Sequence, residues 1–311
     1  RTVLSFPRDR DAIAAERGIS RSELDARIDS MRTRLRAVRE TRIAPGLDDK
    51  CLTSWNGLAL AAFAEASRIL GDVGYREIAE GNAAVIRAAM WDGTRLLHTW
   101  KDGVARVDGL LEDYAYYGLG LVELYKLTGD LAHLEWAAEL LRAILVRFRD
   151  PEHGGFFESP VDGEALLLRQ KPFFDSATPG ENSAVAQLAW WLGRYYGVSQ
   201  WEQVVEECAS QVADHAVAAA NGFGALLLAC QIAQAPRREI VVVGEPASRA
   251  PFEAELAGRF LPGTLIAPGP VGTALPLFEG RGVEGAAAYV CEDMVCQLPA
   301  TSPAAFAAQL G

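Results

Sequence analysis

Acidic, amide and aromatic side chains gather at three places where a loop leads into an apolar stretch of sequence. The residues are Asp48, Asp49, Trp55 and Asn56 at the first place, Glu112, Asp113 and Tyr114 at the second, and Asp175, Glu181, Asn182 and Ser183 at the third. The apolar stretches have the length of helices, so the clusters are predicted at helix N-termini. Free backbone N–H groups and the positive end of the helix dipole lie there, ready for an anion or a hydroxyl.

This combination of groups suits a sugar-like small molecule. Carboxyl groups donate and accept protons, amides bind hydroxyls, and aromatic rings stack on the C–H face of a sugar. We therefore predict an acid–base pair made of Asp113 with Asp48, Asp49 or Asp175. Ligand contacts are expected from the other members of the clusters, which are Trp55, Asn56, Glu112, Tyr114, Glu181, Asn182 and Ser183.

The alternative interpretation is that these acids only stabilise the first turns of helices through the dipole. The substitution Asp113→Asn separates the two interpretations. If Asp113 acts on a ligand, the substitution abolishes binding or turnover and leaves the melting temperature unchanged. If Asp113 is a structural cap, the substitution unfolds the protein.

The sequence offers few signals for other chemistry. No His lies within a few residues of another ligand type at metal spacing, so neither a metal nor another cofactor is predicted. The residues at 243–246 lack the G-x-G-x-x-G spacing of a phosphate-binding loop, and a G-x-S-x-G nucleophile motif is absent.

The cysteines are expected to be reduced. They are an odd, scattered set, Cys51, Cys208, Cys230, Cys291 and Cys296, which is typical of a cytoplasmic protein. Residues five apart on one strand face opposite sides of the sheet, which makes a disulfide between Cys291 and Cys296 unfavourable. Both are predicted to be buried structural thiols.

Charge and hydropathy exclude several classes of partner. The net charge of −11 argues against nucleic acid and against an anionic membrane surface. The apolar stretches are shorter than the roughly 18 residues that a membrane span needs. The chain opens on Arg1 and not on Met, so we expect it to be part of a longer protein.

An internal repeat predicts the fold. Gly71, Gly129 and Gly197 each follow a very apolar segment and precede an amphipathic one. Glycine is the natural residue after a helix C-terminus, so each unit is a helical hairpin. The predicted inner helices are 54–70, 111–128, 182–196 and 222–233, and the outer ones are 75–90, 132–148 and 200–217. With an amphipathic helix at 21–40 this gives eight of the twelve helices of an (α/α)6 toroid, placed at 1–235.

The remaining segments add β structure. Residues 96–107 are predicted to form a hairpin around Asp102-Gly103, and 154–158 with 165–169 a second one. After Pro236 the apolar runs shorten, which indicates a small α/β lobe at 236–311 with strands near 239–244, 264–267 and 286–290. The predicted class is therefore mainly α, an incomplete toroid with a C-terminal lobe.

Several of these motifs together resemble the thioredoxin domain-containing proteins related to spermatogenesis-associated protein 20. The motifs are DDKCLTSWNG at 48–57, LEDYA at 111–115, GGFF at 154–157 and ATPGENS at 177–183. The resemblance implies a toroid similar to those of six-hairpin glycosidases and N-acylglucosamine 2-epimerases. It also implies an upstream thioredoxin-like domain and further toroid helices as partners. Glu112 and Glu181 depart from the family's usual residues. Epimerases of the similar fold use paired His as acid and base, whereas no His stands at an inner helix start in this sequence.

Two classes of function follow. The first is an enzyme, hydrolase or isomerase-like, that acts on a sugar-like molecule in carbohydrate metabolism. The second is a non-catalytic module that binds a ligand or serves the thioredoxin-like partner domain. Toroids of this kind host both.

Overall fold

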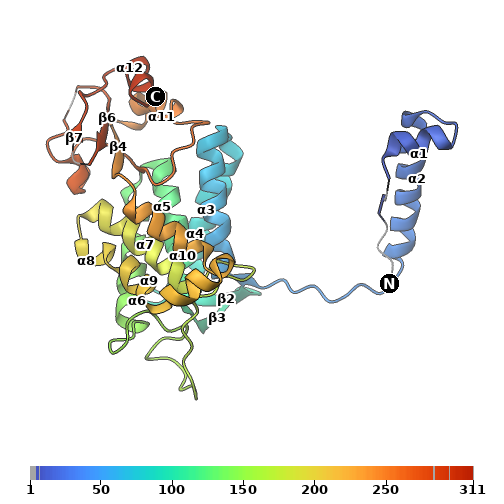
Figure 1. The fold of residues 1–311 in the computed structure, drawn as a ribbon, viewed down its shortest axis with the longest axis horizontal. Helices are drawn as coiled ribbons and strands as arrows, with labels where there is room; N and C mark the ends of the chain where they lie inside the picture. The colour runs from blue at the N-terminus through green and yellow to red at the C-terminus, as the bar shows by residue number, and fades with distance from the viewer. Residues whose placement is uncertain (1–4, 7, 283, 294, 311) are drawn as a thin grey trace. The chain divides into compact units, whose positions relative to one another are not determined.

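The structure is a computed structural model that describes residues 5–6, 8–282, 284–293 and 295–310. The chain folds into two compact units, Arg1–Asp49 and Lys50–Gly311 (Figure 1). The first unit contains α1 (Arg10–Glu16) and α2 (Arg21–Glu40), and Ser20 caps α2 by accepting a hydrogen bond from Glu23 N. The predicted helix at 21–40 is therefore present. Its place among the toroid helices stays a prediction, as does a domain boundary at 235/236.

The second unit is built from helical hairpins. Inner helices α3 (Thr53–Leu70), α5 (Leu111–Thr128), α7 (Glu181–Tyr196) and α10 (Gly224–Gln234) pack one against the next. Outer helices α4 (Val73–Met90), α6 (Leu131–Arg147) and α9 (Val204–Ala218) pack on them, with the short α8 (Ser199–Glu202) and η1 (Ala220–Gly222) in the connections. This alternation of inner and outer helices is the predicted arc of an α/α toroid.

Glycine determines where the inner helices end. Gly71, Gly129 and Gly197 follow α3, α5 and α7 with φ values of 70°, 70° and 68°. Residues with a side chain rarely adopt this left-handed conformation, so the repeated glycines end the helices as predicted.

Glycine also brings α3 and α5 close together. A Cβ added to Gly57 would lie 2.5 Å from the backbone nitrogen of Tyr117, and one added to Gly120 would lie 2.7 Å from Gly57 O. The two backbones therefore touch directly. This contact fixes the start of α3 beside the start of α5.

A small sheet adjoins the helix starts. It has the order β1-β2-β3, from β1 (Cys51–Leu52), β2 (Leu97–Lys101) and β3 (Val104–Asp108), all antiparallel. The predicted turn is present, because Asp102 and Gly103 both have positive φ. Since β1 runs directly into α3, β2 lies next to the first turn of that helix.

The second predicted hairpin, 154–158 with 165–169, is wrong. Among the described residues this segment forms no strand, only an isolated bridge between Arg149 and Phe156. The reason is the side chain of Asn182, which bonds both the N–H and the C=O of Phe156. An amide side chain thus takes the place of a partner strand.

The C-terminal lobe contains a four-stranded sheet of order β5-β4-β6-β7. The strands are β4 (Arg238–Val243), β5 (Leu265–Gly269), β6 (Ala287–Glu292) and β7 (Val295–Cys296), and α11 (Pro246–Ala254), η2 (Pro276–Phe278) and α12 (Pro303–Leu310) complete the lobe. Ile240 and Val242 pack towards α11 and α12, whereas Val241 and Val243 belong to the core of the helices. The sheet is thus buried on both faces.

The lobe lies at the C-terminal ends of the inner helices. Arg249 donates to Thr128 O at the end of α5, and Tyr195 in α7 donates to Ile266 O of β5. Figure 1 shows this lobe at one end of the helices and β2 and β3 at the opposite end. The helix starts are therefore left on the side away from the lobe.

The expectation for the C-terminal cysteines is wrong. Cys291 and Cys296 form a disulfide. They do not lie on one strand: the chain turns between β6 and β7, where Asp293 has positive φ, and the two cysteines face each other across the hairpin. The remaining cysteines, Cys51, Cys208 and Cys230, are free thiols.

The fold class is the predicted one, a mainly α arc of toroid hairpins with a small α/β lobe. Within the part of the chain that the structure describes, no helix is both long and apolar enough to span a membrane.

Candidate functional site

The first turn of α5 is tied to its neighbours by Asp113, which is fully buried. One carboxylate oxygen accepts a hydrogen bond from the backbone N–H of Leu110 at 2.8 Å, and the other accepts from Ser54 N at 2.9 Å. The first bond closes the start of α5, and the second joins it to the start of α3. Asp113 therefore satisfies backbone donors at two helix N-termini at once.

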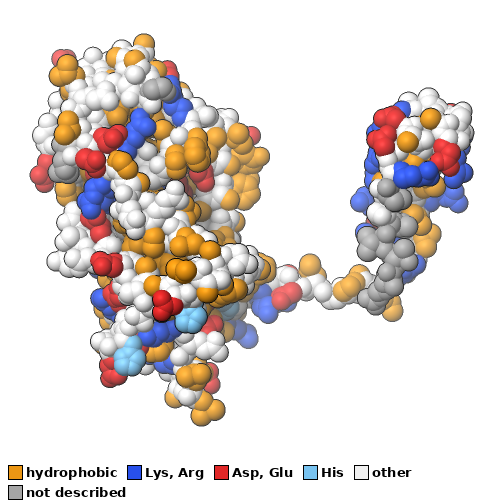
Figure 2. Space-filling view, in the orientation of Figure 1, with side chains coloured by type: hydrophobic (Ala, Val, Ile, Leu, Met, Phe, Trp, Pro, Cys, Tyr) orange, Lys and Arg blue, Asp and Glu red, His pale blue; other side chains and the backbone are white. Residues whose placement is uncertain are grey.

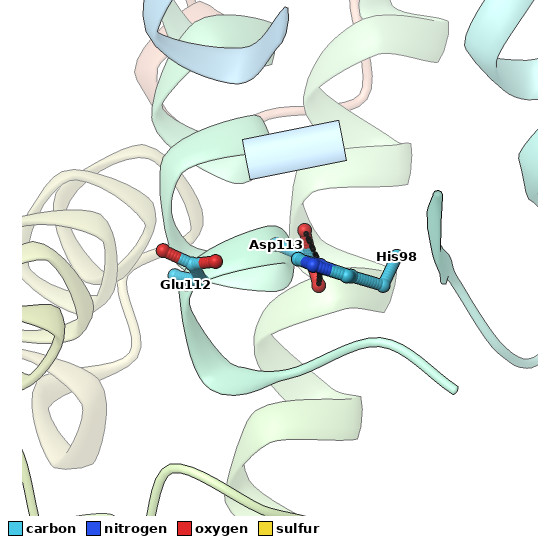
Figure 3. A group of neighbouring side chains, drawn as sticks. All are labelled: His98, Glu112 and Asp113. Carbon is cyan, nitrogen blue, oxygen red and sulfur yellow. Dashed lines mark hydrogen bonds and ion pairs between the residues drawn. The ribbon is translucent and has the colours of Figure 1, made fainter. Parts of the chain in front are cut away.

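The same carboxylate holds a histidine. His98 projects from β2, and its Nδ1 lies 2.9 Å and 3.1 Å from the two oxygens of Asp113 (Figure 3). Because a carboxylate accepts hydrogen bonds, Nδ1 carries the hydrogen and Nε2 is the ring atom left to exchange a proton. The bond to Asp113 raises the pKa of His98, against the opposing effect of burial.

Two further acids lie close to this pair. Glu112 precedes Asp113 on α5. Glu158 lies in the loop before α7, and its backbone carbonyl accepts a hydrogen bond from Leu111 N at 2.9 Å. Burial raises the pKa of Glu112, and the charge of Asp113 adds to the effect. Burial likewise raises the pKa of Asp113, while the bonds from His98 and the backbone oppose that rise.

Glu181, the first residue of α7, is the most perturbed acid of the group. Burial raises its pKa to about 8, and the charges of Glu158 and Glu112 act in the same direction. Its Oε2 is buried and has no hydrogen-bond partner among the described residues. A carboxyl group with these properties is largely protonated at neutral pH and is able to donate a proton. Strongly perturbed groups of this kind cluster at functional sites.

Two predicted ligand-binding residues hold the scaffold instead. The hydroxyl of Tyr114 accepts from Leu96 N and from Arg147 Nη1, both at 2.8 Å. Asn182 is fully buried and bonds the backbone of Phe156. Their polar atoms are occupied by the protein itself, so direct contact with a ligand stays a prediction for both.

Asn56 and Asp175 are also engaged. The amide nitrogen of Asn56 donates to Leu52 O at 2.8 Å, and its oxygen accepts from Asn82 of α4 at 2.9 Å. Asp175 accepts from Gly180 N at 2.7 Å and from Ala225 N at 2.8 Å, which links the loop before α7 to the start of α10. The predicted role of Asp175 as acid or base is untested.

The other predicted residues differ in accessibility. Trp55 is 62% exposed on the first turn of α3, and its ring is open to a ligand. Ser183 is fully buried, and its hydroxyl lacks a partner among the described residues. Asp48 and Asp49 are exposed and belong to the first unit, so their membership of a shared site stays a prediction.

His98, Glu112 and Asp113 also form a group that could hold a metal ion, since one ligand atom from each lies within 4.8 Å of the others. Histidine with carboxylates is a donor set that suits zinc, iron or manganese. Both oxygens of Asp113 already accept hydrogen bonds from backbone N–H groups and from His98, however. The geometry therefore favours an Asp–His pair over a coordination site.

Sequence reasoning missed His98 and Glu158, because it considered only residues at helix starts. The fold brings a histidine to the start of α5 from β2, although none stands there in the sequence. The signal that could have identified His98 is its place in the predicted hairpin at 96–107, just before the acidic pair at 112–113. For Glu158 the corresponding signal is its position directly after the GGFF motif.

Comparison with known proteins gives no matching family model. The chain is similar to spermatogenesis-associated protein 20 of Homo sapiens, with 27% identity over 322 residues, which is 97% of this chain and 41% of the relative. The Mus musculus protein of the same name is 27% identical over 316 residues, 93% of this chain and 39% of the relative. The chain thus spans about two fifths of the length of these relatives.

Similar solved structures include the cellobiose 2-epimerase from Spirochaeta thermophila, with TM-score 0.43 and 18% identity over 52% of this chain and 43% of that one. A family 76 glycoside hydrolase from a bovine Bacteroides thetaiotaomicron strain gives TM-score 0.46 and 17% identity over 54% of this chain and 36% of that one. These likenesses are low and partial. The sequence comparison, over nearly the whole chain, confirms the resemblance to the proteins related to spermatogenesis-associated protein 20.

Proposed function

We propose that this chain binds and processes a neutral, sugar-like small molecule at the starts of α5 and α7, by acid–base chemistry. The observation that carries the proposal is Glu181, whose buried carboxyl oxygen has no protein partner among the described residues and whose pKa is raised to about 8. A buried acid of this kind is costly unless a ligand uses it.

The roles of the residues follow from their contacts. Glu181 is the general acid, because it is protonated near neutral pH. His98 is its counterpart, with Nε2 accepting or donating the second proton, and Asp113 positions it. Glu112 is a partly buried acceptor for a hydroxyl. Trp55 offers an exposed ring face for the C–H side of a sugar.

The charges of the acidic side chains at the site favour a neutral ligand. An anion would meet the carboxyl groups of Glu112 and Glu158, which repel it. A cation would favour ionised Glu181 and so remove the proton that the acid role requires. A neutral polyhydroxy compound both accepts from Glu181 and donates to the carboxylates, which supports the sugar-like class.

The test is a binding screen with the full chain. Neutral mono- and disaccharides, with sugar acids and amino sugars as charged controls, are examined by saturation-transfer NMR at pH 7. Glu181→Gln and His98→Asn are compared with Glu164→Gln, an exposed loop acid that serves as the matched control. We expect binding of neutral sugars by the wild type and the control, and at least tenfold weaker binding by His98→Asn. Glu181→Gln is expected to keep binding and lose turnover, because an amide donates a hydrogen bond but not a proton.

The proposal fails if no neutral sugar binds the folded wild-type chain, or if the Glu181 and His98 variants match the control in both binding and turnover.

The second function, a non-catalytic module that serves a thioredoxin-like partner domain, has one supporting observation. Large apolar side chains are exposed along α9 and α10, among them Val217, Leu227 and Leu228. Figure 2 shows hydrophobic side chains gathered over this part of the surface. Exposed apolar surface of this kind is typical of an interaction site. Retention of a recombinant thioredoxin-like domain by the chain, lost in Leu227→Asp and unaffected by Glu181→Gln, would favour this function over the first.

A further inference from the structure

The β6–β7 hairpin places its disulfide next to a cation. Nη2 of Arg281 lies 3.3 Å from the sulfur of Cys291 and 3.7 Å from that of Cys296. The guanidinium carbon lies 5.2 Å from the centre of the Tyr289 ring. Tyr289 and Cys291 are two residues apart on β6 and share one face, so this packing holds Arg281 over the sulfurs.

The two cysteine residues differ in accessibility. Cys291 is only 2% exposed, whereas Cys296 is exposed on β7. β7 is the edge strand of the sheet, and Figure 1 shows it at the periphery of the lobe. An incoming thiolate therefore reaches Cys296 first, and Cys291 is the sulfur that leaves.

The guanidinium group of Arg281 is able to interact with a nearby anion. Its Nη1 is buried and lacks a hydrogen-bond partner among the described residues. Within the same residues, Arg281 forms no ion pair with an acidic side chain. The acid that faces Cys291 across the sheet is Glu239, and it is paired with Arg194 at 2.5 Å. Glu239 is thus ion-paired with Arg194. Burial lowers the pKa of Arg281, and the charge of Glu239 opposes that effect. Arg281 is the cation that lies directly beside the sulfur of Cys291.

We propose that Cys291–Cys296 is a thiol–disulfide exchange site for a dithiol, in which Arg281 stabilises the thiolate of Cys291. One thiolate of the dithiol attacks the sulfur of Cys296, the bond between the two cysteines breaks, and its electron pair goes to Cys291 beside Arg281. The second thiolate then attacks the mixed disulfide and releases Cys296 as a thiolate, which takes up a proton. The dithiol is oxidised to a disulfide and the protein gains two electrons.

The fold favours reversal of this reaction. Asp293, in the turn of the hairpin, accepts from Arg237 N at 2.8 Å and donates its own N–H to Arg237 O at 3.0 Å. These bonds do not depend on the disulfide. After reduction the hairpin remains closed, and the two thiols stay opposite each other, ready to be reoxidised.

The test measures reduction of the full chain by dithiothreitol at pH 7, with acid quenching, alkylation and peptide mass analysis of the 291–296 segment. Arg281→Met is compared with the wild type and with Arg259→Met, an arginine elsewhere in the lobe. A leaving thiolate that loses its charge partner has a higher pKa and departs more slowly. We expect about tenfold slower reduction in Arg281→Met and an unchanged rate in Arg259→Met.

A second measurement covers the case in which Arg281→Met does not fold. In the reduced wild type, the pH dependence of iodoacetamide labelling gives the pKa of Cys291, which we expect below the ordinary value of about 8.5. The proposal is overturned by equal reduction rates in folded Arg281→Met and wild type, by a Cys291 pKa at or above that value, or by a wild-type chain in which these cysteines stay unpaired after mild oxidation.

Discussion

The starts of α5 and α7 share a two-residue pattern, Glu112-Asp113 in one and Glu181-Asn182 in the other. The second residue of each pair is fully buried and bonds the backbone of a neighbouring segment. The first residue is a half-buried glutamate whose carboxyl group has a raised pKa. In both pairs the buried member holds the helix start in place, while the glutamate is the group for which we propose a ligand contact.

The two starts differ in what the buried member adds. Asp113 carries charge and holds His98, so the start of α5 includes a proton-exchanging pair. Asn182 is neutral and bonds only backbone, and among the described residues no cation is ion-paired with Glu181 to stabilise its ionised form. One start therefore favours imidazolium, and the other favours a neutral carboxylic acid. Acid–base chemistry needs this kind of separation between neighbouring titrating groups.

The largest effect is expected from Asp113→Ala. The substitution leaves Ser54 N and Leu110 N without their acceptor and leaves His98 without its partner. We expect the free energy of unfolding to fall by about 4 kcal/mol, measured by urea denaturation. Glu164→Ala, at an exposed loop position, is the control and should change it by less than about 0.5 kcal/mol.

Asp113→Asn is informative as well. A ligand-binding role predicts an unchanged melting temperature, whereas an amide at this site presents an NH₂ group to one of the two backbone donors and should lower it. A variant with the wild-type melting temperature would show that Asp113 does not hold the helix starts.

Glu181→Gln is expected to stabilise the protein at high pH. The pKa of Glu181 is about 8 in the folded chain, against an ordinary glutamate value of 4.5. A raised folded-state pKa gives stability that is present below about pH 4.5 and is lost as pH rises towards 8. The glutamine variant lacks this loss, so it should be more stable at pH 8 by on the order of 2 kcal/mol and equal at pH 4.5. Urea denaturation at the two pH values measures the difference, and a constant difference would contradict the assignment.

His98 should titrate at a higher pH than His133. Asp113 raises the pKa of His98, whereas burial lowers the pKa of His133 on α6. NMR titration of the imidazole resonances gives the order directly. Stability from protonated His98 is complete below its unfolded pKa of about 6.5 and is lost as pH rises through the higher folded value. The reverse order of titration would contradict the pairing of Asp113 with His98.

The smallest effect on stability is expected from Trp55→Ala. The ring is 62% exposed, so its removal should change the free energy of unfolding by less than about 0.5 kcal/mol. If Trp55 is a stacking surface, sugar affinity nevertheless falls by about tenfold, since ring stacking contributes on the order of 1 kcal/mol. A large loss of stability, or unchanged affinity for a sugar that binds the wild type, would remove Trp55 from the site.

The helical hairpins, and the helix ends at which polar groups gather, can be predicted from the amino-acid sequence. Apolar periodicity and the glycines at 71, 129 and 197 depend on neighbours within a few residues, so both are readable locally. The turn at Asp102-Gly103 is local in the same way.

Which polar residues come together, and which of them have raised pKa values, depends on tertiary contacts. His98 reaches Asp113 from another element, Asn182 replaces a partner strand for Phe156, and Cys296 meets Cys291 because the chain turns back on itself. The pKa of Glu181 depends on burial and on acids 23 and 69 positions earlier in the chain, Glu158 and Glu112. The cysteine pair depends on a turn between residues five apart. The other properties arise from contacts distant in sequence, whose geometry no local pattern records.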